Sequence, residues 1–225
     1  MNGARYAVYY APGEDHPLWQ AGCSWLGRNP ADPHDHRPAP PQRQEPWRYG
    51  FHATLKAPLQ LPPGRDEAQL DQALQALATR SAAFEMPRLQ VDTLADFIAL
   101  RPAAPLPREH ALWRLADACV RELDAFRAPP SAAEQARRLA KPLEGEALQR
   151  LAQWGYPHVL EGWRFHMTLS DALPEPERAA LMAAAHPHFE AALAAQPLRC
   201  TDLCLFQQPA PGRPFVLQRR YRLAG

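Results

Sequence analysis

Two segments that lie far apart in this chain of 225 residues are nearly identical: Phe51-His52-Ala53-Thr54-Leu55 and Phe165-His166-Met167-Thr168-Leu169. In both segments apolar and polar side chains alternate with a period of two, which is typical of a β-strand with one buried face. The histidine and the threonine of each segment therefore share the face opposite the core, about 6.5 Å apart along the strand. Because packing alone requires neither side chain there, their recurrence predicts one site built from two halves, with a histidine from each.

The same order of elements is predicted after each segment: the motif strand, a long helix and two strands that form a hairpin. The first copy comprises 51–61, 66–82, 88–93 and 96–101, and the second comprises a strand from about 162, then 175–194, 198–207 and 214–223. Such self-similarity indicates a duplicated unit, with repeats at 51–102 and 165–224 and a helical connector at 108–154. Two copies related by a pseudo-twofold axis would place the two motif strands side by side.

Further elements are predicted outside the repeats. They are a strand at 5–11, helices at 16–26, 109–127, 131–139 and 144–154, and a proline-rich loop at 29–46. Because hairpins favour antiparallel sheets, we predict the α+β class, with two pseudo-symmetric lobes of largely antiparallel sheet and flanking helices around a central cleft. We expect residues 1–225 to form a single two-lobed domain.

Composition and charge restrict the range of partners. The formal net charge is +1 and 22% of the residues are charged, so nothing in the balance favours a long nucleic acid as a partner. The sequence has no apolar run long enough to span a membrane and no signal-peptide pattern at its N-terminus, so we expect a cytoplasmic protein without membrane association. The four cysteines lack a zinc-binding spacing and are predicted to be buried thiols. The oligomeric state is left open.

The motifs and their surroundings resemble a known family. Two H-x-T motifs in repeated surroundings resemble the 2H phosphoesterase superfamily. The wider context is similar to one branch of it, which is encoded beside carbon–phosphorus lyase genes and named for phosphonate metabolism. The resemblance covers essentially the whole chain and includes Tyr49 to Pro58, Trp154 to Tyr156, Arg5 to Pro12 and Trp25 to Arg28.

The motif residues themselves indicate acid–base chemistry on a phosphodiester. One histidine can take a proton from the attacking water while the other protonates the leaving oxygen, because the imidazole pKa of about 6.5 allows both states near neutrality. Thr54 and Thr168 can donate hydrogen bonds to the non-bridging oxygens. Which of His52 and His166 is the base stays open. We expect no metal and no other cofactor, because two imidazoles and two hydroxyls make a poor site for a hard cation.

Three more residues are candidates for binding substrate. Lys56 would extend the row formed by His52 and Thr54, and its ammonium could hold a second phosphate. Ser170 is the equivalent of Lys56 in the second motif, and Tyr49 lies just ahead of the first motif.

The resemblance implies a small phosphorylated substrate that contains a cyclic phosphate. The phosphonate branch narrows this to a ribose 1,2-cyclic phosphate that carries a 5-phosphate, opened by metal-independent hydrolysis to a ribose bisphosphate. Two alternatives are a nucleotide or RNA 2′,3′-cyclic phosphodiesterase and a non-catalytic protein that only binds a phosphate ligand.

Overall fold

The two motif strands are neighbours at the centre of a seven-stranded sheet. A computed structural model describes residues 3–35, 37–130, 143–195 and 197–225. In it β2 (Ala53–Leu59) pairs antiparallel with β6 (Met167–Thr168), with Ala53 opposite Met167. The expectation that the two motif strands lie side by side is confirmed by this pairing.

The sheet is antiparallel between all its neighbouring strands, in the order β4-β5-β6-β2-β1-β8-β9. A separate pair of short strands, β3 and β7, is also antiparallel. The predicted class, α+β with largely antiparallel sheet, is therefore confirmed. The remaining strands are β1 (Arg5–Tyr10), β3 (Phe84–Glu85), β4 (Leu89–Leu94), β5 (Phe97–Pro102), β7 (Arg199–Cys200), β8 (Asp202–Gln208) and β9 (Val216–Arg222).

Each hairpin joins the motif strand of the other copy. The β4–β5 hairpin follows β2 in the chain but pairs with β6, whereas β8–β9 follows β6 and reaches β2 through β1. Each half of the sheet thus contains strands from both predicted repeats. The boundaries of the repeats, 51–102 and 165–224, and of the connector at 108–154 stay a prediction.

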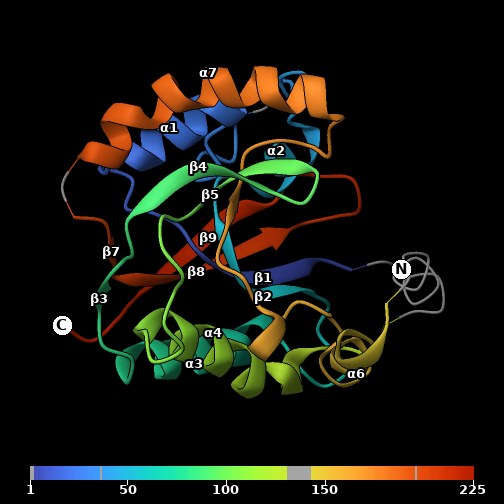
Figure 1. Ribbon diagram of the computed structural model, residues 1–225. Helices are drawn as coiled ribbons and strands as arrows, with labels where there is room; N and C mark the ends of the chain where they lie inside the picture. The colour runs from blue at the N-terminus through green and yellow to red at the C-terminus, as the bar shows by residue number, and fades with distance from the viewer. Residues whose placement is uncertain (1–2, 36, 131–142, 196) are drawn as a thin grey trace.

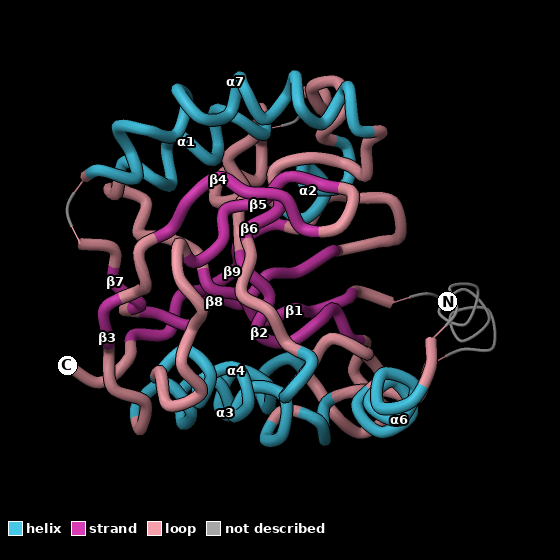
Figure 2. Tube along the Cα trace, in the orientation of Figure 1, coloured by secondary structure: helices cyan, strands magenta, loops and turns pink. Residues whose placement is uncertain are grey.

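The helices lie outside the sheet in two groups, with the strands between them (Figure 1; Figure 2). One group holds α1 and α7, and α7 packs against β4 and β5; the other holds α3 and α4, which pack against β8–β9 and β2. These contacts cover the face of the sheet opposite the motif histidines. The helices are α1 (Pro17–Leu26), α2 (Gln44–Tyr49), α3 (Glu67–Thr79), α4 (Ala111–Glu122), α6 (Gly145–Trp154) and α7 (Glu175–Ala194), with short 3₁₀ turns at η1 (Asp124–Phe126) and η2 (Leu160–Gly162).

Several predicted boundaries shift. The second motif strand does not begin near 162, because the η2 turn occupies 160–162 and β6 holds only two residues. The end of the predicted loop at 29–46 is already part of α2. The predicted helix at 109–127 ends at Glu122, where the chain tightens into the η1 turn. The predicted helix at 131–139 lies outside the described residues.

The four cysteines are free and buried, as expected. No helix in the described part of the chain is long and apolar enough to cross a membrane.

The first motif strand is locked in place by a close contact with α1. Phe51 is fully buried and stacks on Phe189 of α7, with ring centroids 6.2 Å apart. Gly22 of α1 lies against the same ring, so that a Cβ at position 22 would be only 2.2 Å from the Phe51 ring atoms. The absence of a side chain at Gly22 is what allows α1 to approach the start of the motif.

Gly22→Ala is therefore expected to destabilise the protein. Alanine favours the helix by about 1 kcal/mol, but overpacking a closed core site costs about 1–3 kcal/mol. The Phe51 ring is fully buried and stacked on Phe189, so the clash should outweigh the gain. Urea unfolding would measure the change, with the exposed Ser24→Ala in the same helix as the control. A Gly22→Ala protein more stable than wild type would contradict the packing described.

Candidate active site

The two histidines and two threonines of the motifs form a four-cornered group on one face of the sheet. Since Ala53 lies opposite Met167 in an antiparallel pair, His52 lies opposite Thr168 and Thr54 lies opposite His166. The histidines thus occupy one diagonal, about 7–8 Å apart and slightly less at Cβ, and the threonines occupy the other. The structure brings together these four sequence-predicted residues, and we refer to them as the His–Thr square.

Both imidazoles are held in the same way. Nδ1 of His52 donates to the Gly50 carbonyl oxygen at 2.8 Å, and Nδ1 of His166 donates to the Arg164 carbonyl oxygen at 2.8 Å. A carbonyl oxygen only accepts, so in each neutral ring the proton is on Nδ1 and the lone pair is on Nε2. Nε2 of His52 lies 3.3 Å from the Thr54 hydroxyl. Both rings therefore present the atom that can accept a proton.

Local backbone geometry places the carbonyl that holds His52. Gly50 ends α2 with a φ of 80°, a value that favours glycine, and a Cβ there would lie 2.8 Å from Pro30. Arg28, which is buried, donates from Nε and Nη2 to the Trp47 carbonyl oxygen at 3.1 and 2.9 Å. These interactions fix the end of α2, and with it the turn that leads into His52.

Tyr9 is a site residue that the sequence analysis did not find. Its ring stacks on the His52 imidazole with centroids 3.7 Å apart and an angle of 26° between the planes. Tyr9 lies opposite Thr54 on the neighbouring strand β1, which explains why it shares the face of the motif. Alternation predicted that Tyr9 lies in a strand, but only the pairing of β1 with β2 brings its ring into contact with His52.

Burial and neighbouring cations keep both imidazoles neutral. The pKa of His52 is lowered to about 4, mainly by burial and also by His166 and Arg28, against the hydrogen bond to Gly50, which raises it. Burial also lowers the pKa of His166, with contributions from His158 and Arg101. An anionic phosphate between the two rings would favour protonation of either one, because an opposite charge nearby stabilises the imidazolium.

Lys56 does not lie in the row where alternation placed it. Thr54 pairs with Tyr9 and Lys56 pairs with the adjacent Val8, so a β-bulge interrupts β2 between the two. The bulge turns Lys56 to the helix-covered face, where Nζ donates to the Val120 carbonyl oxygen at 2.8 Å and to Asp124 at 2.9 Å. The predicted contact of Lys56 with substrate is not supported by this position.

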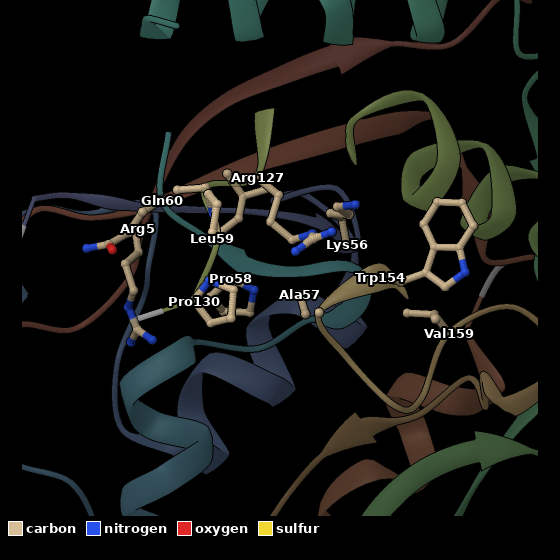
Figure 3. A pocket seen from close by; sticks show the side chains of 13 residues that line it. Arg5, Lys56, Ala57, Pro58, Leu59, Gln60, Arg127, Pro130, Trp154 and Val159 are labelled. Atoms are coloured by element: carbon tan, nitrogen blue, oxygen red, sulfur yellow. The ribbon is translucent and has the colours of Figure 1, made fainter. Parts of the chain in front are cut away.

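The surroundings of Lys56 leave little room for a ligand. Figure 3 shows the ends of Lys56 and Arg127 side by side, and both bind Asp124 Oδ1. The cavity that they line with Trp154 and Val159 has a volume of about 30 Å³, and the Lys56 ammonium is already bonded to the Val120 carbonyl oxygen and to Asp124.

Ser170 and Tyr49 also differ from expectation. The β6 strand ends at Thr168, so alternation no longer applies at Ser170, which is buried. Its hydroxyl accepts from the Ile98 amide at 2.9 Å and donates to the Asp171 carbonyl oxygen at 2.8 Å, which places it in the backbone framework. Tyr49 stacks on Phe215 at 5.2 Å and lies 6.1 Å from the His52 ring, at the side of the square. Their predicted roles in substrate binding stay predictions.

The chain belongs to the family described as "Protein of unknown function (DUF1045)", whose profile matches residues 54–216. The match includes Thr54 of the first motif and the whole of the second.

Two curated relatives are named ribose 1,5-bisphosphate phosphokinase PhnN. The relative from Janthinobacterium sp. (strain Marseille) is 39% identical over 98% of this chain and 51% of its own length. The relative from Laribacter hongkongensis (strain HLHK9) is 37% identical over 96% of this chain and 51% of its own length. This chain therefore spans about half the length of these relatives. Among solved structures, E. coli LigT complexed with 3′-AMP is 16% identical, with a TM-score of 0.43 over 100% of both chains.

The low pKa of His52 predicts a loss of stability in acid. The folded protein keeps the ring neutral down to about pH 4, whereas the unfolded chain takes up a proton near pH 6.5. The contribution of the neutral His52 ring to the free energy of unfolding is thus fully present above pH 6.5. It is lost as the pH falls toward 4, by up to about 1.4 kcal/mol per pH unit. Urea unfolding at several pH values should show a shallower slope in His52→Asn. His186→Asn, on the exposed face of α7, should keep the wild-type slope; equal slopes in all three proteins would refute the assignment.

The pair of Lys56 and Asp124 predicts a second change in stability. Asp124→Ala leaves the Lys56 ammonium, only 4% exposed, without its carboxylate. Breaking a buried pair costs about 3–5 kcal/mol, and we expect about 2–3 kcal/mol because Asp124 is partly exposed. Glu146→Ala breaks the surface pair with Arg150 and should cost less than about 1 kcal/mol. If Asp124→Ala and Glu146→Ala lower the free energy of unfolding in urea by equal amounts, the pair of Lys56 and Asp124 does not stabilise the fold as described.

Proposed function

We propose that this protein is a metal-independent cyclic phosphodiesterase, and that it opens ribose 1,2-cyclic phosphate 5-phosphate to ribose 1,5-bisphosphate. The observation that carries this proposal is the His–Thr square. Cleavage of a phosphodiester needs a base and an acid on opposite sides of phosphorus, and two histidines on the diagonal of the square meet that need. Two hydroxyls on the other diagonal suit the non-bridging oxygens.

The names of the relatives support the choice of substrate. Both are named as kinases of ribose 1,5-bisphosphate, and this chain matches about half of their length. Ribose 1,5-bisphosphate is the product of opening ribose 1,2-cyclic phosphate 5-phosphate between phosphorus and O2. The proposed reaction would therefore supply the substrate that the relatives are named for.

We assign the base to His52 and the acid to His166. Burial and the nearby Arg28 disfavour a charged His52 by lowering its pKa, which suits a group that begins the reaction neutral. His52 Nε2 takes a proton from water, and the water oxygen attacks phosphorus. His166 enters this step as an imidazolium, because the bound anionic phosphate favours its protonation at Nε2. The bond between phosphorus and O2 breaks, and O2 takes that proton from His166 Nε2. The neighbouring threonine hydroxyls stabilise the charge that develops on the non-bridging oxygens.

The test is ³¹P NMR of the purified protein with ribose 1,2-cyclic phosphate 5-phosphate in EDTA. We expect the wild type to open the ring, and His52→Ala and His166→Ala each to lose about 10²- to 10⁴-fold in kcat/KM, as removal of a general acid or base does. The double variant should lose far less than the product of the two losses, because the two groups act together.

His186→Ala, which lies outside the site, is the matched control and should keep wild-type activity. Turnover that survives in either motif variant, or that EDTA abolishes, would contradict the two-histidine mechanism. Turnover of 2′,3′-cyclic AMP alone would keep the mechanism and replace the substrate. Tight binding of the cyclic phosphate without turnover would identify a binding protein instead.

A further inference from the structure

An open cavity of about 390 Å³ adjoins the His–Thr square on the side of His166, and the proposed function leaves it unused. Its walls include Gln90, Asp92 and Arg101 from the β4–β5 hairpin, Arg164 from the segment before β6, and the rings of Trp113 and Trp163. The cavity has room for a sugar phosphate, unlike the space beside Lys56.

Two observations connect this cavity with the reacting histidine. Leu100 pairs with Met167, so Arg101 lies opposite His166 on the same face, and its charge is close enough to lower the pKa of His166. Arg164 supplies the carbonyl oxygen that holds His166 Nδ1, while its side chain lines the cavity. Arg101 therefore lies about one strand spacing, roughly 5 Å, beyond the square, and Arg164 lies two residues before His166 in the chain.

The two guanidinium groups have donors to spare. Arg101 is oriented by Nη1, which donates to Asp92 Oδ2 and to the Thr93 carbonyl oxygen, each at 2.7 Å. Its Nε and Nη2 have no hydrogen-bond partner among the described residues. Arg164 is exposed, and within the same part of the chain its guanidinium has neither a hydrogen bond nor an ion pair. With Asp92 counted, the wall carries a net charge of about +1 before any histidine is protonated.

The aromatic walls do not offer an open shelf for a nucleobase. The Arg108 guanidinium covers the Trp113 ring at 4.4 Å from its centroid, and Trp163 meets Trp113 nearly edge-on at 4.9 Å. Trp163 is itself buried, and its Nε1 donates to the Thr54 carbonyl oxygen at 2.9 Å. The groups available to a ligand in the cavity are therefore the guanidinium groups of the arginines, which suit a phosphate, because the tryptophan rings are already packed against other side chains.

We propose that Arg101 and Arg164 form the subsite for the second, non-reacting phosphate group of the substrate. This inference rests on the proposed function, in which the cyclic phosphate occupies the His–Thr square, and it assigns to these arginines the role expected from sequence for Lys56. The subsite makes the enzyme selective for sugar cyclic phosphates that carry a further phosphate.

The experiment compares ribose 1,2-cyclic phosphate with and without its 5-phosphate, in wild type, Arg101→Gln, Arg164→Gln and Arg48→Gln. In the two subsite variants we expect the preference for the 5-phosphorylated substrate to fall by about 10-fold or more, in the range of charged hydrogen bonds. The kcat/KM for the substrate without a 5-phosphate should fall much less than that for the 5-phosphorylated substrate, so the readout is the ratio of the two values in each variant. Arg48 precedes the first motif, pairs with Glu45 at the surface and serves as the control, so its variant should keep the wild-type preference.

Calorimetric binding of ribose 5-phosphate separates this inference from the proposed function, because it requires no turnover. We expect the Kd to rise about 10-fold or more in Arg101→Gln and Arg164→Gln and to stay unchanged in Arg48→Gln. If no cyclic phosphate is opened but this binding pattern is found, the proposed function fails and the subsite stands. If ribose 5-phosphate does not bind to wild type, or binds equally well to all four proteins, the subsite is wrong. Arg164 is exposed, so its variant tests the subsite even if Arg101→Gln does not fold.

Discussion

The pairing of β2 with β6, with Ala53 opposite Met167, is the constraint on which the site depends. Side chains alternate along a strand, so a slip of one residue would turn the histidine and threonine of one motif into the core. The same pairing joins the two halves of the sheet, since β4–β5 attach through β6 and β1, β8 and β9 attach through β2. The short pairing of β2 with β6 therefore both joins the two halves of the sheet and brings the four motif side chains together.

The environment of the two imidazoles is nearly symmetric, but not fully so. Each Nδ1 is held by the carbonyl oxygen two residues earlier, so both rings present Nε2 to the same space. The Tyr9 ring stacks on His52 and the buried Arg28 lowers the His52 pKa, whereas His158 and Arg101 lower the pKa of His166. The two similar motifs therefore have different electrostatic surroundings, which is what the proposed division into a base and an acid requires.

Local pattern was sufficient for elements whose period was uninterrupted. The helix at 67–79 and the two hairpins lie within a few residues of their predicted ranges, because their apolar spacing extends over several turns or strand repeats. A bulge in β2 turns Lys56 away from the face that alternation indicates, and β6 ends before Ser170. A bulge and a strand end depend on the neighbouring strands, and a period-two pattern carries no information about them.

The sequence by itself determined that two strands carry a histidine and a threonine on one face, and that the sheet is largely antiparallel. Only the tertiary structure decided which residues surround those four side chains. Tyr9, Arg28 and Arg101 reach the site from three segments outside the two motifs. The physical reason is that alternation fixes the direction of a side chain within its own strand, whereas its neighbours across the sheet depend on register and on strand order.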